Sequence, residues 1–101
     1  MKLKNKTVIV TGAAQGLGYA CALRFLQDGA NVVMADVNAE KLADSVQGLV
    51  EFDGAVSSMV CDVTKRENLQ ALVDLAVSNY GNLDVMINNA GIAKVQDFLE
   101  I

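Results

Sequence analysis

The sequence predicts an α/β fold, a doubly wound parallel sheet with helices on its faces. Three observations support this prediction. Four short apolar runs suited to buried strands recur along the chain, three stretches with helical apolar spacing separate them, and the connections are only a few residues long. Such alternation of strands and helices is typical of right-handed crossovers in a parallel sheet.

The four predicted strands are residues 7–10 (TVIV), 31–35 (NVVMA), 55–61 (AVSSMVC) and 83–87 (LDVMI). All but the third are nearly continuous in apolar side chains, as expected for strands buried on both faces of a parallel sheet. The third alternates more, with Ser57 and Ser58 in its middle, which favours a position at the sheet edge.

The first predicted helix covers residues 17–28. Leu17, Cys21 and Phe25 recur every four residues and predict its inward face, and Gly29 is a suitable C-terminal stop.

Two further helices are predicted from capping signals. Asn38 is a candidate cap for the second helix. Thr64 and Glu67 form a candidate capping box for the third, whose apolar spacing continues to Tyr80. The inward face of the second helix is predicted to consist of Leu42, Val46, Leu49 and Val50.

These elements predict a sheet of strand order 3-2-1-4, ending after the fourth strand. Residues 1–101 contain no linker, repeat or low-complexity stretch, so they are expected to form a single domain, whole or partial. An exposed fourth-strand edge at residues 83–88 would favour self-association, and a homo-oligomer is therefore expected.

Composition excludes several function classes. The net charge is −4, with 8 basic and 12 acidic residues and no basic cluster, so neither a nucleic-acid nor a membrane partner is expected. The two cysteines lack a CxxC spacing, and a cytoplasmic setting is the plain interpretation. The sequence has no histidine, which argues against a His-based zinc site and the usual hydrolase pairs, and no metal site is expected.

The stretch TGAAQGLG, residues 11–18, joins the first strand to the first helix. Gly12 would permit a tight turn, Gly16 would let a pyrophosphate approach the backbone, and Gly18 would let the helix pack closely on the sheet. The spacing GxxxGxG differs from the GxGxxG fingerprint, so an ordinary turn remains an alternative. Asp36 ends the second strand, 18 residues after Gly18, where a carboxylate can accept hydrogen bonds from ribose hydroxyls.

Four motifs at four successive strand ends resemble the N-terminal half of the short-chain dehydrogenase/reductase family. They are TGAAQGLG, Asp36, CDV at residues 61–63 and NNAG at residues 88–91. The resemblance spans essentially the whole chain. It implies a Rossmann-like fold and an NAD(P)-dependent oxidoreductase that transfers hydride between an alcohol and a ketone.

The resemblance also implies a set of cofactor-binding residues. The glycines would face the phosphates, Asp36 the adenosine ribose and Asp62 the adenine amino group. Thr11, Asn88 and Asn89 would tie the first and fourth strands together. Asp62 could instead only begin the third helix, and the asparagines could form only a turn. The implied set is Gly12, Gln15, Gly16, Leu17, Gly18, Asp36, Asp62, Val63, Asn89, Ala90 and Gly91.

NAD is expected rather than NADP. Asp36 would repel a 2′-phosphate, no basic residue follows it directly, and Gln15 stands where NADP-preferring relatives often have one. The family's catalytic Tyr-x-x-x-Lys pair is missing, since Tyr19 is followed four residues later by leucine and Tyr80 by aspartate. The 101-residue chain alone is therefore predicted to be inactive. A non-catalytic nucleotide-binding or redox-sensing module and an inactive fragment are the alternatives.

Overall fold

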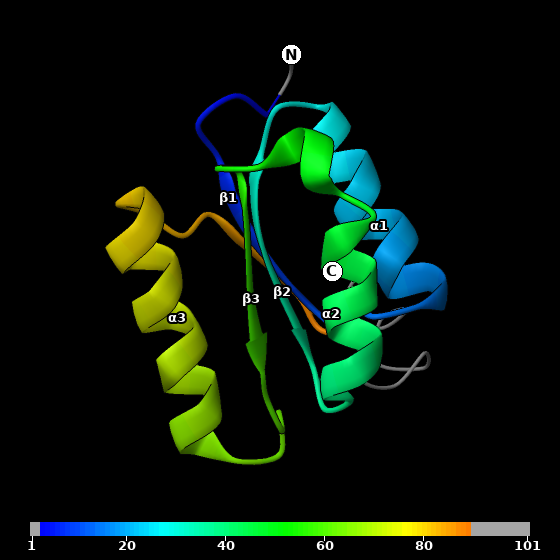
Figure 1. Cartoon of the computed structure of the whole chain (residues 1–101). Coiled ribbons are helices and arrows are strands. Elements are labelled where there is room, and N and C mark those ends of the chain that lie inside the picture. The colour runs from blue at the N-terminus through cyan, green and yellow to red at the C-terminus, as the bar shows by residue number, and fades with distance from the viewer. Residues whose placement is uncertain (1–2, 90–101) are drawn as a thin grey trace.

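The computed structural model describes residues 3–89. Strands and helices alternate along the described chain (Figure 1). The elements are β1 (Thr7–Thr11), α1 (Gly16–Gln27), β2 (Asn31–Asp36), α2 (Ala39–Gln47), the short 3₁₀ helix η1 (Val50–Phe52), β3 (Val56–Val60), α3 (Arg66–Tyr80) and β4 (Val85–Ile87).

The described strands form one parallel sheet in the order β3-β2-β1-β4. This confirms the predicted fold class and strand order. β1 lies inside the sheet and all five of its residues are buried, whereas β3, the strand with the serines, lies at an edge, as its alternation predicted.

Two apolar cores lie on opposite faces of the sheet. Alternate residues of β1 point to opposite faces. Val8 and Val10 join the core beneath α1 and α2, while Ile9 joins the core beneath α3. Figure 1 shows α1 and α2 on one side of the strands and α3 on the other. This two-sided cover explains why β1 and β2 have nearly continuous apolar sequences.

The inward face of α1 differs from the prediction. Its buried residues are Gly18, Ala22 and Leu26, whereas Leu17 is 51% exposed. The buried face is therefore one position away from the predicted stripe, because small residues at 18 and 22 let the helix axis approach the sheet. Gly29 follows the helix with φ of +93°, which agrees with its predicted role as a stop.

The predicted cap of α2 is confirmed. Asn38 Oδ1 accepts a hydrogen bond of 3.0 Å from the Lys41 amide. Of its predicted inward residues, Leu42 and Leu49 are buried, but Val50 is 73% exposed. The prediction for Val50 was wrong because the α-helix ends at Gln47 and η1 turns this side chain to solvent.

The capping box predicted for α3 was also wrong. The helix begins at Arg66 with Lys65 at the N-cap, and Lys65 makes no side-chain capping bond. The hydroxyl and amide of Thr64 instead both donate to Asp62 Oδ1, at 2.6 and 2.9 Å. Because the Thr64 hydroxyl takes part in this local aspartate turn, it does not cap the helix that begins at Arg66.

β4 begins at Val85 and is therefore shorter than predicted, and Asp84 just before it forms a junction with β1. The Thr7 amide donates to Asp84 Oδ2 at 2.9 Å, and the Asp84 amide donates to the Thr7 carbonyl at 2.9 Å. Among the described residues β4 pairs only with β1, and Val85 is 38% exposed. No helix within residues 3–89 is long and apolar enough to cross a membrane.

Candidate functional site

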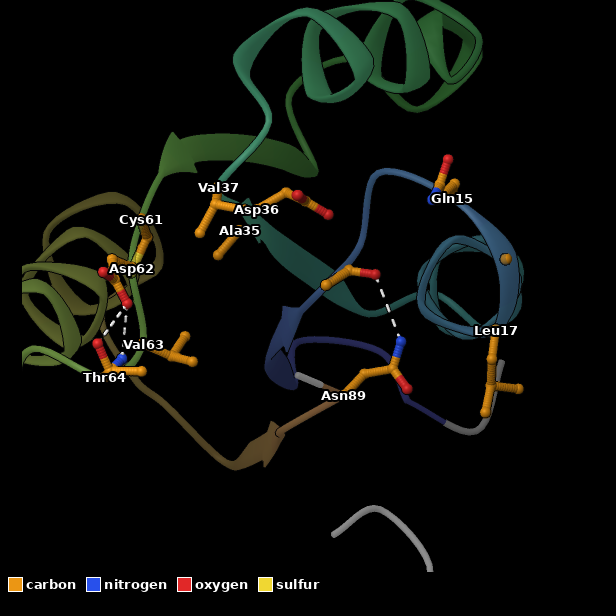
Figure 2. A pocket seen from close by; sticks show the side chains of 12 residues that line it. Gln15, Leu17, Ala35, Asp36, Val37, Cys61, Asp62, Val63, Thr64 and Asn89 are labelled. Carbon is orange, nitrogen blue, oxygen red and sulfur yellow. Dashed lines mark hydrogen bonds between the residues drawn. The ribbon is translucent and has the colours of Figure 1, made fainter. Parts of the chain in front are cut away.

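A cavity of about 510 Å³ lies at the carboxyl ends of the strands (Figure 2). This is where parallel α/β sheets generally bind ligands. The lining residues come from the end of β2, from the start of α1 and from the segments that follow β1, β2, β3 and β4. They are Gly12, Gln15, Gly16, Leu17, Ala35, Asp36, Val37, Cys61, Asp62, Val63, Thr64 and Asn89.

The N-terminus of α1 opens onto this cavity. Gln15 is its N-cap and makes no side-chain capping bond with any described residue. The first amides of a helix have no partner within the helix and carry the positive end of its dipole. Gln15, Gly16 and Leu17 all line the cavity, so this end can bind an anion there.

Glycine is suited to each of its three positions in the loop for a different structural reason. Gly12 and Gly16 have φ of +62° and +61°, which glycine adopts with little cost. A Cβ on Gly18 would lie 2.0 Å from the Gly12 carbonyl oxygen, so Gly18 permits close packing of helix and strand, as predicted. A Cβ on Gly16 would meet no described atom within 4 Å, which leaves this backbone open to a ligand.

Asp36 connects the end of β2 to two neighbouring segments. Its Oδ2 accepts from the Ala14 amide at 3.0 Å, and its Oδ1 accepts from the Asn38 amide at 3.0 Å. Each carboxylate oxygen has a second lone pair, so Asp36 can still accept hydrogen bonds from hydroxyl groups in the cavity. The carboxylate therefore both shapes the loop and remains available to a ligand.

Asp62 lies at the opposite side of the cavity from Gln15 and Leu17 (Figure 2). The hydrogen bonds from the Thr64 hydroxyl and amide hold the pKa of its carboxyl below the usual range. Its amide donates to Asn68 Oδ1 at 3.3 Å. Asp62 does precede α3, as the alternative interpretation required, but it also lines the cavity.

Asn89 closes the cavity where β1 meets the end of β4. Its amide donates to Thr11 Oγ1 at 2.9 Å, and its Nδ2 donates to the Gly12 carbonyl at 3.4 Å. Thr11 Oγ1 also lies 3.1 Å from Asn88 Oδ1, which agrees with the predicted tie between the two strands. Asn89 Oδ1 is buried and has no hydrogen-bond partner among the described residues.

The cavity is acidic rather than basic. Asp36 and Asp62 line it, and no lysine or arginine does so within the described part of the chain. An anionic group would therefore be held by backbone amides, while hydroxyl and amino groups would find carboxylate acceptors. No cluster of three potential metal ligands occurs in residues 3–89.

The structure brings most of the predicted site residues together. Gly18 lies behind the loop rather than on the lining, and Ala90 and Gly91 lie outside the described residues. Those that line the cavity are Gly12, Gln15, Gly16, Leu17, Asp36, Asp62, Val63 and Asn89.

Four lining residues were missed by sequence reasoning: Ala35, Val37, Cys61 and Thr64. Each lies at or just after the end of β2 or β3, which is the signal that could have identified it. Burial, and then the neighbouring Asp62 charge, raise the pKa of the Cys61 thiol.

Comparisons with known proteins agree with the geometry. The family model "short chain dehydrogenase" matches residues 6–101. The 3-oxoacyl-(acyl-carrier-protein) reductase FabG of Thermotoga maritima is 39% identical over 94 residues, which cover 93% of this chain and 38% of that protein. The chain thus spans little more than a third of this relative's length.

Two solved structures extend the comparison. A short-chain dehydrogenase/reductase of unknown function from Caenorhabditis elegans, crystallised with cofactor, has a TM-score of 0.80 and 31% identity, covering 85% of this chain and 33% of the other. A hydroxysteroid dehydrogenase from Escherichia coli has a TM-score of 0.79 and 36% identity, covering 86% and 37%. With its fold, its loop and this match over nearly its whole length, the chain belongs to the short-chain dehydrogenase/reductase family.

Proposed function

We propose that the chain forms the adenosine side of an NAD-binding site in an oxidoreductase of this family. The observation that carries the proposal is that the uncapped N-terminus of α1 and the Asp36 carboxylate face one cavity. The first suits phosphate and the second suits ribose hydroxyls. The described residues fit such a ligand, because the backbone at Gly16 is open and Asn89 Oδ1 is buried without a described partner.

The loop residues bind the pyrophosphate in this proposal. Gly16 and Leu17 offer amides at the helix start, and the missing side chain at Gly16 leaves room for a phosphate oxygen to approach them. Gly12 keeps the turn tight, and Gly18 keeps the helix close to the end of β1. Gln15 contributes a neutral side chain at the same end of the cavity.

The strand ends bind the adenosine. Asp36 accepts hydrogen bonds from the ribose hydroxyls, and Asp62 accepts from the adenine amino group, with the backbone of Val63 beside it. Val37 is 68% exposed and lies on the lining with Val63, so the two offer apolar surface to a flat base. Asn89, followed by Ala90 and Gly91, completes the adenosine side.

NAD is preferred to NADP because of charge. A 2′-phosphate would replace the hydroxyl nearest the Asp36 carboxylate, where no basic side chain of the described lining could neutralise it. Like charges in a partly enclosed cavity repel each other, and the carboxylate would also lose a hydroxyl donor.

A bound nicotinamide cofactor would accept or donate the hydride that interconverts an alcohol and a ketone on a small organic substrate. The family's Tyr-x-x-x-Lys pair is absent from these 101 residues, so this chain binds and orients the adenosine side without a proton donor of its own. We therefore propose that it does not turn over substrate by itself. Self-association through the β4 edge and a cytoplasmic setting belong to the same proposal.

Calorimetric titration of the chain with NAD and with NADP tests the proposal. We expect saturable binding of NAD, at least about tenfold tighter than binding of NADP, which corresponds to about 1.4 kcal/mol. Asp36→Asn keeps a hydrogen-bond acceptor but removes the charge, and should reduce the difference in affinity between NAD and NADP. Asp53→Asn, at an exposed turn, is the matched control. No binding of NAD to the folded chain, or tighter binding of NADP, would contradict the proposal.

A further inference from the structure

Two neighbouring segments hold the backbone of Ala14, which lies in the glycine-rich loop (TGAAQGLG, residues 11–18). The Ala14 amide donates to Asp36 Oδ2 at the end of β2, at 3.0 Å. The Ala14 carbonyl accepts a hydrogen bond from Ser45 Oγ on α2. Neither Ala14 nor Ser45 lines the cavity at the strand ends, so these contacts act on the loop from behind.

Ser45 is unusual for a serine within a helix. Such a hydroxyl commonly turns back to the carbonyl four residues earlier, but this one reaches a segment 31 residues away. The helix that carries it is well anchored, because Leu42 is 3% exposed. Its cap, Asn38, also donates its amide to Asp36, so α2, Asp36 and the loop form one connected network.

The Ser45 contact fixes the orientation of a peptide group next to the helix start. Because a peptide is planar, fixing the Ala14 carbonyl also fixes the direction of the Gln15 amide. Gln15 is the N-cap of α1, and Gly12 and Gly16 on either side of this group are the most freely rotating residue type. A loop held in its binding conformation loses less entropy when a ligand binds.

Solvent can replace the Ser45 hydroxyl without disrupting a core. Ser45 and Ala14 share an open hollow of about 340 Å³ with Gln15, Gly16, Tyr19 and Asp44. Water entering this hollow could bond to the Ala14 carbonyl after the hydroxyl is removed. Loss of the hydroxyl should therefore loosen the loop more than it destabilises the fold.

We propose that Ser45 is a positioning residue, which holds the glycine-rich loop in its nucleotide-binding conformation without touching the nucleotide. This inference rests on the proposed NAD site. Removal of one hydrogen bond of ordinary strength predicts roughly 3- to 10-fold weaker NAD binding.

The test compares three variants of the chain. Ser45→Ala removes the hydroxyl, Ser45→Thr keeps it, and Ser78→Ala removes an exposed hydroxyl from α3 as the matched control. Amide hydrogen exchange without nucleotide measures protection of Ala14 and of amides in α3, and calorimetry measures the affinity for NAD. We expect Ser45→Ala to raise exchange at Ala14 several-fold, to leave α3 unchanged and to weaken NAD binding. Ser45→Thr should restore both properties.

The outcomes separate this inference from the proposed function. The positioning role would be overturned if Ser45→Ala left the exchange rate at Ala14 unchanged, or if it raised that rate without weakening NAD binding. It would also be overturned if exchange became as much faster throughout α3 as at Ala14. If the original chain binds no NAD, the proposed function fails instead. Exchange at Ala14 then still decides whether Ser45 holds the loop.

Discussion

Gly18→Ala is the sharpest test of how α1 is placed against the sheet. Two effects oppose each other at this position. Alanine is favoured over glycine in a helix interior by about 1 kcal/mol. The added Cβ, however, would lie 2.0 Å from the Gly12 carbonyl oxygen and 2.7 Å from Asn89 Nδ2. The first of these atoms is backbone and cannot move aside without shifting the loop.

The steric effect should be the larger of the two, so Gly18→Ala should lower the free energy of unfolding. Overpacking costs about 1–3 kcal/mol, and contact with backbone places this site near the upper end. After subtraction of the helix preference, the free energy of unfolding should fall by about 2 kcal/mol. For a chain of this size such a loss lowers Tm by roughly 8–16 °C.

Urea and thermal unfolding measure this effect, with Gly48→Ala as the matched control. Gly48 has φ of −70°, and a Cβ there would meet the Ser45 carbonyl and the Tyr19 hydroxyl at an ordinary 3.4 Å. The control should be neutral or stabilise by up to about 1 kcal/mol. A Gly18→Ala variant as stable as the original chain would refute the close-packing argument.

Three further variants or conditions test local contacts. Asn38→Ala should lower the free energy of unfolding by about 1 kcal/mol through loss of the α2 cap, whereas Lys65→Ala, at an N-cap without a side-chain bond, should change it little in the same urea assay. The lowered pKa of Asp62 means that its ionised form stabilises the fold above the unfolded value of about 3.9, and that this contribution is lost as pH falls through the lowered folded value. Thr64→Val should raise the Asp62 pKa in an NMR titration, and an unchanged pKa would exclude the hydroxyl as its main cause. Burial and the raised pKa of Cys61 predict that a thiol-alkylating reagent at pH 8 modifies it much more slowly in the folded chain than in urea, and equal rates would contradict its burial.

Sequence reasoning predicted the sheet well because its signals are local or repeat along the chain. The apolar runs of β1 and β2 indicated that these strands are central, and the serines of β3 indicated that it lies at an edge. Asn38 was identified as a cap because its partner lies three residues away.

The errors arose where a tertiary contact or a competing local bond decided the outcome. The buried face of α1 contains Gly18 and Ala22, because these small residues let the helix approach the sheet closely, and hydrophobic spacing does not reveal this effect. Thr64 bonds to Asp62 instead of capping α3. The Ser45 contact with Ala14 joins residues 31 positions apart, and no periodicity or motif indicates it.

An NMR titration of the isotope-labelled chain with NAD tests the central claim most directly, because it shows where the nucleotide binds. The account predicts saturable shifts of the amides of Gly12, Gly16 and Leu17 at the helix start, together with Asp36 and Val63 at the strand ends. The amides of α3 far from the cavity should stay unchanged. Saturable shifts confined to other surfaces, or no shifts at all in a folded chain, would contradict the assignment of this cavity to the nucleotide.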